Sequence, residues 1–194
     1  MTETQNRPVG CILIDDPVSG EDLLSGLSLP DGLLAHPVQW RTGEKPLEAL
    51  QALLQRVRKA CGAAGVLALG AGCMAALALA EQLPVERLAL VEPMFEPAGL
   101  TFTRRRFTGF AMRNLALCVS DALIVGSGDS RVARQIARGL RANGRVTRVS
   151  LPGGNGQDLY TICENDAQRA VFAFLLGEEL PKDLAQNSEM LYNH

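Results

Sequence analysis

The stretch that decides the fold reads Val66-Leu67-Ala68-Leu69-Gly70-Ala71-Gly72-Cys73-Met74-Ala75-Ala76-Leu77. Its apolar beginning is typical of a buried strand, its small central residues of a tight turn, and its Ala- and Leu-rich end of a helix. Two unrelated kinds of site are built on a strand, a turn and a helix in this order. The choice between them nearly determines the fold.

The first kind of site places a nucleophile on the strained turn, with small residues two positions before it and two or three after it. Cys73 fits that place, since Ala71 precedes it and Ala75 and Ala76 follow it. A thiol at a helix N-terminus has a lowered pKa, which suits a nucleophile. The alternative for Cys73 is a buried side chain that fills space under the helix, a common role of cysteine.

The second kind of site is a dinucleotide fingerprint, for which Gly70-x-Gly72-x-x-Ala75 has the spacing. Its glycines allow a pyrophosphate to approach the helix N-terminus, and Glu92 takes the place of the acid that binds a ribose hydroxyl. This fingerprint normally follows the first strand of its fold. Here an earlier apolar run, 9–14, already predicts a strand, which counts against the dinucleotide hypothesis.

Predicted strands and helices alternate along the chain, which indicates a mostly parallel sheet of about six strands in a three-layer α/β/α sandwich. The predicted strands are 9–14, 32–40, 66–69, 87–91, 122–125 and 146–151, and the predicted helices are 46–61, 73–82, 109–118, 131–142 and 166–176. We expect a single domain over 9–177, a polar N-terminal tail over 1–8 and a polar C-terminal tail over 178–194. Ligands of such folds bind at the carboxyl ends of the strands.

Several segments resemble the α/β-hydrolase family over roughly residues 9–176, with the family's first strands absent. Ala71-x-Cys73-Met74-Ala75-Ala76 is similar to the family's G-x-S-M-G-G turn, and 83–93 is similar to the family's next segment, a helix end and a strand. Leu123-Ile124-Val125-Gly126-Ser127-Gly128-Asp129 resembles the strand and loop with the triad acid. Leu151-Pro152-Gly153-Gly154-Asn155 resembles the loop that normally ends in the triad histidine. The resemblance implies a hydrolase-like domain with a minimal lid.

The same resemblance implies damaged catalytic machinery. Cys73 and Asp129 are the candidate nucleophile and acid, and the backbone N–H of Met74 is a candidate oxyanion donor. Asn155 or Gly156 stands where the histidine is expected, and neither His36 nor His194 is well placed as a base.

The loop where the family binds the oxyanion is equally unusual, because it reads Asp15-Asp16-Pro17. Pro17 has no N–H, and two carboxylates oppose a developing anion.

The composition of the chain limits the classes of partner and cofactor that can be expected. A net charge of −2 over 194 residues favours neither nucleic acid nor a membrane surface as partner. The five cysteines form no C-x-x-C pair and the start of the chain shows no signal peptide, so free thiols in a reducing cytoplasm are expected. No Cys/His group has zinc-site spacing, so neither a metal nor another cofactor is expected. A small-molecule ligand and a homo-oligomer are both compatible with the sequence.

Three functions therefore stay open. The first is a catalytically degenerate hydrolase-like protein that binds a small ligand or partner above Cys73. The second is an active hydrolase or acyl transferase that attacks small esters or thioesters with Cys73. The third is a dinucleotide-binding domain that uses Gly70, Gly72, Ala75 and Glu92.

Overall fold

The computed structural model describes residues 8–16, 27–38, 46–94, 115–116, 119–127, 130–141, 144–151, 164–186 and 188–191. Their main feature is a seven-stranded sheet in the order β2-β1-β3-β4-β6-β8-β9. Six of these strands are parallel, and β9 pairs antiparallel with β8. The strands are β1 (Val9–Ile14), β2 (Leu33–Val38), β3 (Ala64–Leu69), β4 (Val85–Val91), β6 (Val119–Ser127), β8 (Val146–Leu151) and β9 (Ser188–Leu191).

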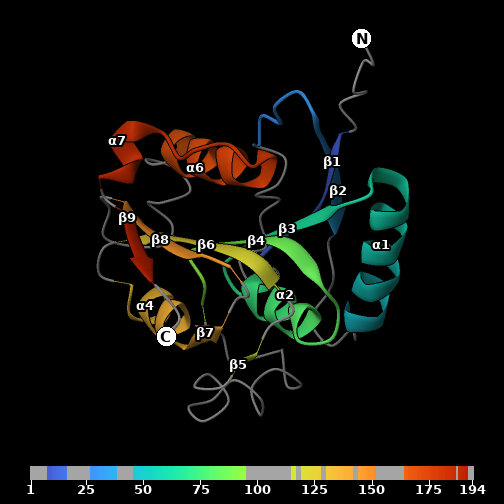
Figure 1. Ribbon diagram of the computed structural model, residues 1–194. Coiled ribbons are helices and arrows are strands. Elements are labelled where there is room, and N and C mark those ends of the chain that lie inside the picture. Colours follow the sequence, from blue (N-terminus) through green and yellow to red (C-terminus); the bar gives the residue numbers. More distant parts are fainter. Residues whose placement is uncertain are drawn as a thin grey trace.

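Helices cover both faces of the sheet, as Figure 1 shows. One face carries α1 (Pro46–Cys61), α2 (Gly72–Ala80) and α4 (Arg131–Gly139), and the other carries α6 (Glu164–Leu176) and α7 (Lys182–Ala185). A small second sheet pairs β5 (Leu115–Ala116) with β7 (Leu140–Arg141). This arrangement confirms the predicted three-layer α/β/α sandwich with a mostly parallel sheet.

The period-two alternation of the strands divides the core into two layers. Ile12, Val66, Leu88, Ala122 and Val146 occupy one register row across five neighbouring strands, and all are fully buried under α1, α2 and α4. The next row points to the opposite face, where Leu67 and Leu123 pack against α6. Strands buried on both faces read as continuous apolar runs, which explains why the sequence reveals them.

Helix ends follow the expected capping residues. Ser130 caps α4, because its Oγ accepts a hydrogen bond from the backbone N–H of Ala133 at 3.2 Å. Gly177, with a φ of 81°, follows the last residue of α6. The start of α4 at residue 131 and the end of α6 at residue 176 confirm the predicted helix ends.

Three segments differ from the sequence-based prediction. The segment 178–194 contains α7 and the sheet strand β9, where a polar tail was expected, because the antiparallel edge offers backbone partners that hydrophobicity does not reveal. The helix expected over 109–118 lies largely outside the described residues, and its described part, Leu115–Ala116, is a strand. Helix α4 ends at Gly139, three residues before the predicted end.

Among the described residues, no helix is both long enough and apolar enough to span a bilayer.

Candidate functional site

The turn between β3 and α2 follows the inner strand β3, which lies between β1 and β4. Gly70 is the first residue after β3 and has a φ of 51°, a left-handed conformation that favours glycine. Its backbone is held on two sides, since its N–H donates to the Val91 carbonyl at 3.0 Å and its carbonyl accepts from the Met94 N–H at 3.1 Å. The chain then enters α2 at Gly72. The sharp strand-to-helix turn expected from the sequence is therefore present, and its strained residue is Gly70.

The carboxyl end of β1 packs tightly against both glycines of this turn. A Cβ on Gly70 would overlap the Asp16 carboxylate, whose Cγ would lie 2.6 Å away. A Cβ on Gly72 would overlap the Asp15 carbonyl oxygen and would approach Cγ2 of Ile14 at 3.1 Å. The protein's own β1 end thus occupies the space that both glycines leave open, and close backbone approach explains why both positions are glycine.

Cys73 lies within the first turn of α2 and is fully buried. Its Sγ donates to the carbonyls of Ala68 at 3.2 Å and Val91 at 3.7 Å. Burial raises the pKa of the Cys73 thiol well above its usual value, and the negative charges of Asp16 and Glu92 raise it further. The prediction of a turn thiol with a lowered pKa is therefore wrong: desolvation outweighs any effect of the helix N-terminus.

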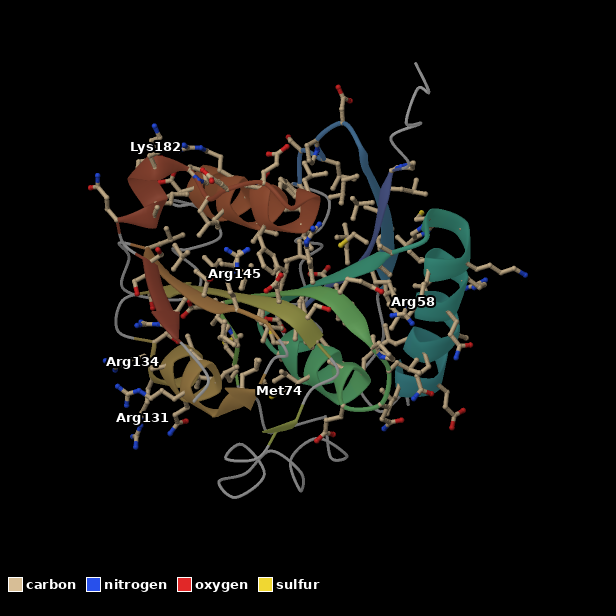
Figure 2. The ribbon with its side chains drawn as sticks, viewed as in Figure 1. Arg58, Met74, Arg131, Arg134, Arg145 and Lys182 are labelled. Carbon is tan, nitrogen blue, oxygen red and sulfur yellow. The ribbon has the colours of Figure 1, made fainter. Side chains whose placement is uncertain are left out.

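Met74 cannot serve as the predicted oxyanion donor in this geometry. Its backbone N–H donates to the Ala71 carbonyl at 3.1 Å, within the turn that opens α2. Its side chain is buried, and Figure 2 shows Met74 on α2, beneath the sheet. The N–H groups that a helix N-terminus offers to a ligand are those without such a partner.

The backbone of the turn distinguishes Gly70 from Cys73. Gly70 is the left-handed residue of the turn, and the small residues Ala68 and Gly72 lie two positions on either side of it. Cys73, the candidate nucleophile from the sequence, lies three residues later inside α2, and its neighbours Ala71 and Ala75 are also small.

Four polar side chains at the carboxyl ends of neighbouring strands surround this turn. Asp15 and Asp16 follow β1, Glu92 follows β4, and Ser127 ends β6, and all four are buried. The Glu92 carboxylate accepts hydrogen bonds from the Ser127 N–H at 2.8 Å and the Ser127 hydroxyl at 3.3 Å. Glu92 also has a φ of 42°, which is rare for a residue with a side chain. Among the described residues at this edge of the sheet, three of the four buried polar side chains are therefore acidic.

The other predicted site residues are not brought together by the described structure. Asp129, Asn155 and His194 lie outside the described residues. His36 lies on the edge strand β2, two strands away from β3, and its Nε2 is buried without a hydrogen-bond partner. Within the part of the chain that the structure describes, no group of three His, Cys, Asp or Glu side chains could hold a metal ion.

Comparisons with known proteins bear on the fold alone. A solved structure of a carboxylesterase from the ammonia-oxidizing thaumarchaeon Nitrososphaera gargenis is similar, with a TM-score of 0.55 and 13% sequence identity. The match covers 89% of this chain and 92% of the carboxylesterase. No protein-family model and no curated protein sequence matches this chain. The chain thus has an α/β fold similar to that of an α/β-hydrolase, at an identity too low to carry over an activity.

Proposed function

We propose that this protein is a catalytically degenerate α/β-hydrolase-like protein that binds a small ligand at the carboxyl edge of its sheet and does not hydrolyse it. The observation that carries the proposal is the left-handed Gly70 at the β3–α2 turn. A hydrolase of this fold needs a nucleophilic side chain at the strained residue. Glycine has no side chain, and the Asp16 carboxylate takes the adjacent space.

The surroundings of the turn support binding without turnover. Acyl transfer needs N–H donors aimed at a developing oxyanion. Here the carboxylates of Asp15, Asp16 and Glu92 lie at the ends of the neighbouring strands, and negative charge destabilises an oxyanion. Ligands of open α/β sheets bind outside the carboxyl ends of the strands, near the point where the strand order reverses. In this sheet that point lies between β1 and β3, where Asp16 meets Gly70.

The activity test compares wild type with Cys73→Ala and Gly70→Ala on p-nitrophenyl esters and small thioesters. The expected result is that all three hydrolyse these substrates no faster than an equal concentration of bovine serum albumin. Turnover in wild type that disappears in Cys73→Ala would instead establish the cysteine hydrolase and overturn the proposal.

A labelling experiment tests the same point without a substrate. Iodoacetamide should leave Cys73 unmodified in the folded protein and should alkylate it after denaturation, because the thiol is buried and its pKa is raised. Peptide mass spectrometry separates Cys73 from the other cysteines. Rapid alkylation of Cys73 in the folded protein would contradict the burial on which the proposal relies.

The binding half of the proposal is tested by thermal shift with a panel of small organic molecules, followed by calorimetry of the hits. A ligand at the proposed edge should stabilise wild type, and Asp16→Asn should abolish the shift. The matched control is Glu178→Gln, an exposed carboxylate beyond the end of α6, which should retain it. Hits that are indifferent to Asp16, or a panel without hits, count against binding at this edge.

The dinucleotide hypothesis has weaker support. Gly70 and Gly72 are accounted for by the approach of Asp16 and Asp15, and the Glu92 carboxylate already accepts two hydrogen bonds from Ser127. We therefore expect NAD and FAD at millimolar concentration to leave the melting temperature unchanged. A stabilisation by either one that Glu92→Gln removes would favour the dinucleotide-binding domain instead.

A further inference from the structure

Helix α4 presents a strongly basic surface. Over residues 130–157 the sequence contains six arginines and no acidic residue, although the chain as a whole is acidic. Three of these arginines, Arg131, Arg134 and Arg138, lie on α4 and are exposed. They follow the i, i+3, i+7 spacing that places side chains along one side of a helix.

The opposite side of α4 holds the helix in place. Ala133, Ile136 and Ala137 are buried against β6 and β8. The apolar side of α4 is therefore buried in the core, and the arginines project away from it. Figure 2 shows Arg131 and Arg134 extending outward from α4 at the periphery of the molecule. We call the exposed side formed by Arg131, Arg134 and Arg138 the α4 arginine face.

The position of Arg131 opposes the stability of its own helix. It is the first residue of α4, and the first turn contains no acidic residue. The helix macrodipole makes a cation unfavourable there and favours Asp or Glu. Moreover, neither Arg131 nor Arg138 forms an ion pair with a carboxylate of the described residues. The described residues therefore supply no carboxylate that stabilises this cation, whereas an anionic partner would supply one.

The chemistry of the face selects among anionic partners. It carries no aromatic side chain on which bases could stack, which argues against single-stranded nucleic acid. Its apolar residues are buried, so none is available to insert into a lipid surface. The three guanidinium groups span about 10 Å along the helix, which is two turns. Carboxylates spaced three and four residues apart on a helix of another protein match that span.

We propose that the α4 arginine face docks an acidic helical segment of a partner protein. Each guanidinium offers paired N–H donors that fit a carboxylate, which makes arginine better suited than lysine for such contacts. The contact is exposed, so its strength depends on ionic strength. The proposal concerns a different surface from the Gly70 turn and does not depend on the proposed function.

The test uses fluorescence anisotropy of the full chain with a labelled helical peptide that carries glutamates three and four positions apart. We expect saturable binding that Arg131→Gln/Arg134→Gln/Arg138→Gln weakens about tenfold. Raising NaCl from about 50 mM to about 200 mM should weaken it as well. The same peptide with glutamines in place of the glutamates should not bind. The neutral substitutions keep good helix formers, and circular dichroism checks that the variant is folded.

The matched control places the same number of neutral substitutions on other exposed cations, as Arg56→Gln/Lys59→Gln/Lys182→Gln on α1 and α7. It should keep the wild-type affinity within about twofold. Equal weakening by both triple variants would overturn the proposal, because it would reflect net charge alone. Absence of saturable binding would overturn it too, as would tighter binding to single-stranded oligouridine or to phosphatidylserine vesicles than to the peptide.

A second readout separates recognition from a structural role. Arg131→Glu should raise the melting temperature, since the acid favours the helix N-terminus, and at the same time weaken peptide binding. A lower melting temperature for this variant would show that Arg131 supports the fold and would contradict the proposal.

Discussion

At the scale of single residues, Gly70 is the position that the structure restricts to glycine for two separate reasons. Two independent constraints act on it: its left-handed backbone and the Asp16 carboxylate beside it. Gly62 also has a positive φ, 84°, but nothing lies within 4 Å of the place of its Cβ. Alanine at Gly62 would therefore introduce only backbone strain, whereas alanine at Gly70 would introduce both backbone strain and steric overlap.

We predict that Gly70→Ala destabilises the fold by about 3 kcal/mol, because it combines about 1 kcal/mol of backbone strain with the overlap against Asp16. Gly62→Ala should cost only about 1 kcal/mol. Urea unfolding of both variants provides the comparison. The double variant Gly70→Ala/Asp16→Ala should show a coupling that recovers part of the loss. Equal losses for Gly70→Ala and Gly62→Ala would mean that Asp16 does not fill the space above the turn.

A second residue-scale prediction concerns pH and the buried thiols. Burial raises the pKa of Cys11 to about 12 and that of Cys73 well above its usual value. Above the unfolded-state pKa of about 8.5, only the unfolded chain loses these protons, so stability is kept below that pH and falls above it. The expected slope is about −1.4 kcal/mol per pH unit for each thiol.

Urea unfolding between about pH 8 and about pH 10 measures that slope. Cys73→Ala should make the slope of unfolding free energy against pH less steep by the contribution of one thiol, about 1.4 kcal/mol per pH unit. The control Ile12→Val removes buried volume without a titrating group and should keep the wild-type slope. A slope unchanged by Cys73→Ala would contradict the raised pKa.

The sequence predicted the strand, the turn and the helix, but it left two positions open for a nucleophile. Ala68, Ala71, Gly72 and Ala75 all satisfy the requirement for small neighbours, so Gly70 and Cys73 fit the nucleophile pattern equally well by spacing. The structure shows how the two positions differ, because Gly70 has a positive φ and Cys73 lies inside α2. Glycine tolerates positive φ, but position 72 is also glycine, so residue type alone does not identify the left-handed residue.

At the scale of elements, the hydrophobic pattern predicted those strands and helices that bury a continuous apolar surface. The strands β1, β4, β6 and β8 came from apolar runs, and α1 from its apolar stripe, because each buries a continuous surface. The elements β5, β7 and β9 span two to four residues, and their pairing depends on backbone partners distant in the sequence. Hydrophobic patterning does not report such partners, which is why the sequence did not reveal these strands.

A long-range hydrogen bond adds to the apolar packing of α6 on the sheet. Arg87 of β4 donates from Nη1 to the Leu175 carbonyl at 2.6 Å, and its guanidinium lies where a Cβ on Gly177 would be. It thus satisfies a carbonyl in the last turn of the helix, where a cation is favourable. We predict that Arg87→Met costs about 1–2 kcal/mol of stability.

Thermal or urea unfolding checks this value, and Arg169→Met is the matched control. Arg169 pairs with Asp166 and Asp183 at 3.0 Å, but this contact is exposed to solvent and should contribute less stability than the Arg87 contact. A larger loss for Arg169→Met than for Arg87→Met would contradict the assignment of a stabilising role to the Arg87 contact.

At the scale of the whole molecule, the two edges of the sheet are closed differently. The edge strand β2 contains Pro37, which has no N–H to offer an incoming strand. On the other side, β9 pairs along β8 from Val149↔Ser188 to Val146↔Leu191. The antiparallel addition ends a series of six parallel strands and leaves β8 with partners on both sides.

We therefore predict that a chain ending at Gln186, without β9, unfolds at a lower temperature and self-associates with increasing concentration. The loss of β9 leaves the outer backbone groups of β8 without sheet partners, and an unpaired strand of this kind templates edge-to-edge pairing. Light scattering after size exclusion, at two protein concentrations, measures the association, and a melting curve measures the stability. The control ends at Leu191 and retains β9, so it should behave as the full chain does. If the chain ending at Gln186 kept the mass and melting temperature of that control, β9 would be an accessory strand, and the sheet edge at β8 would be protected by other means.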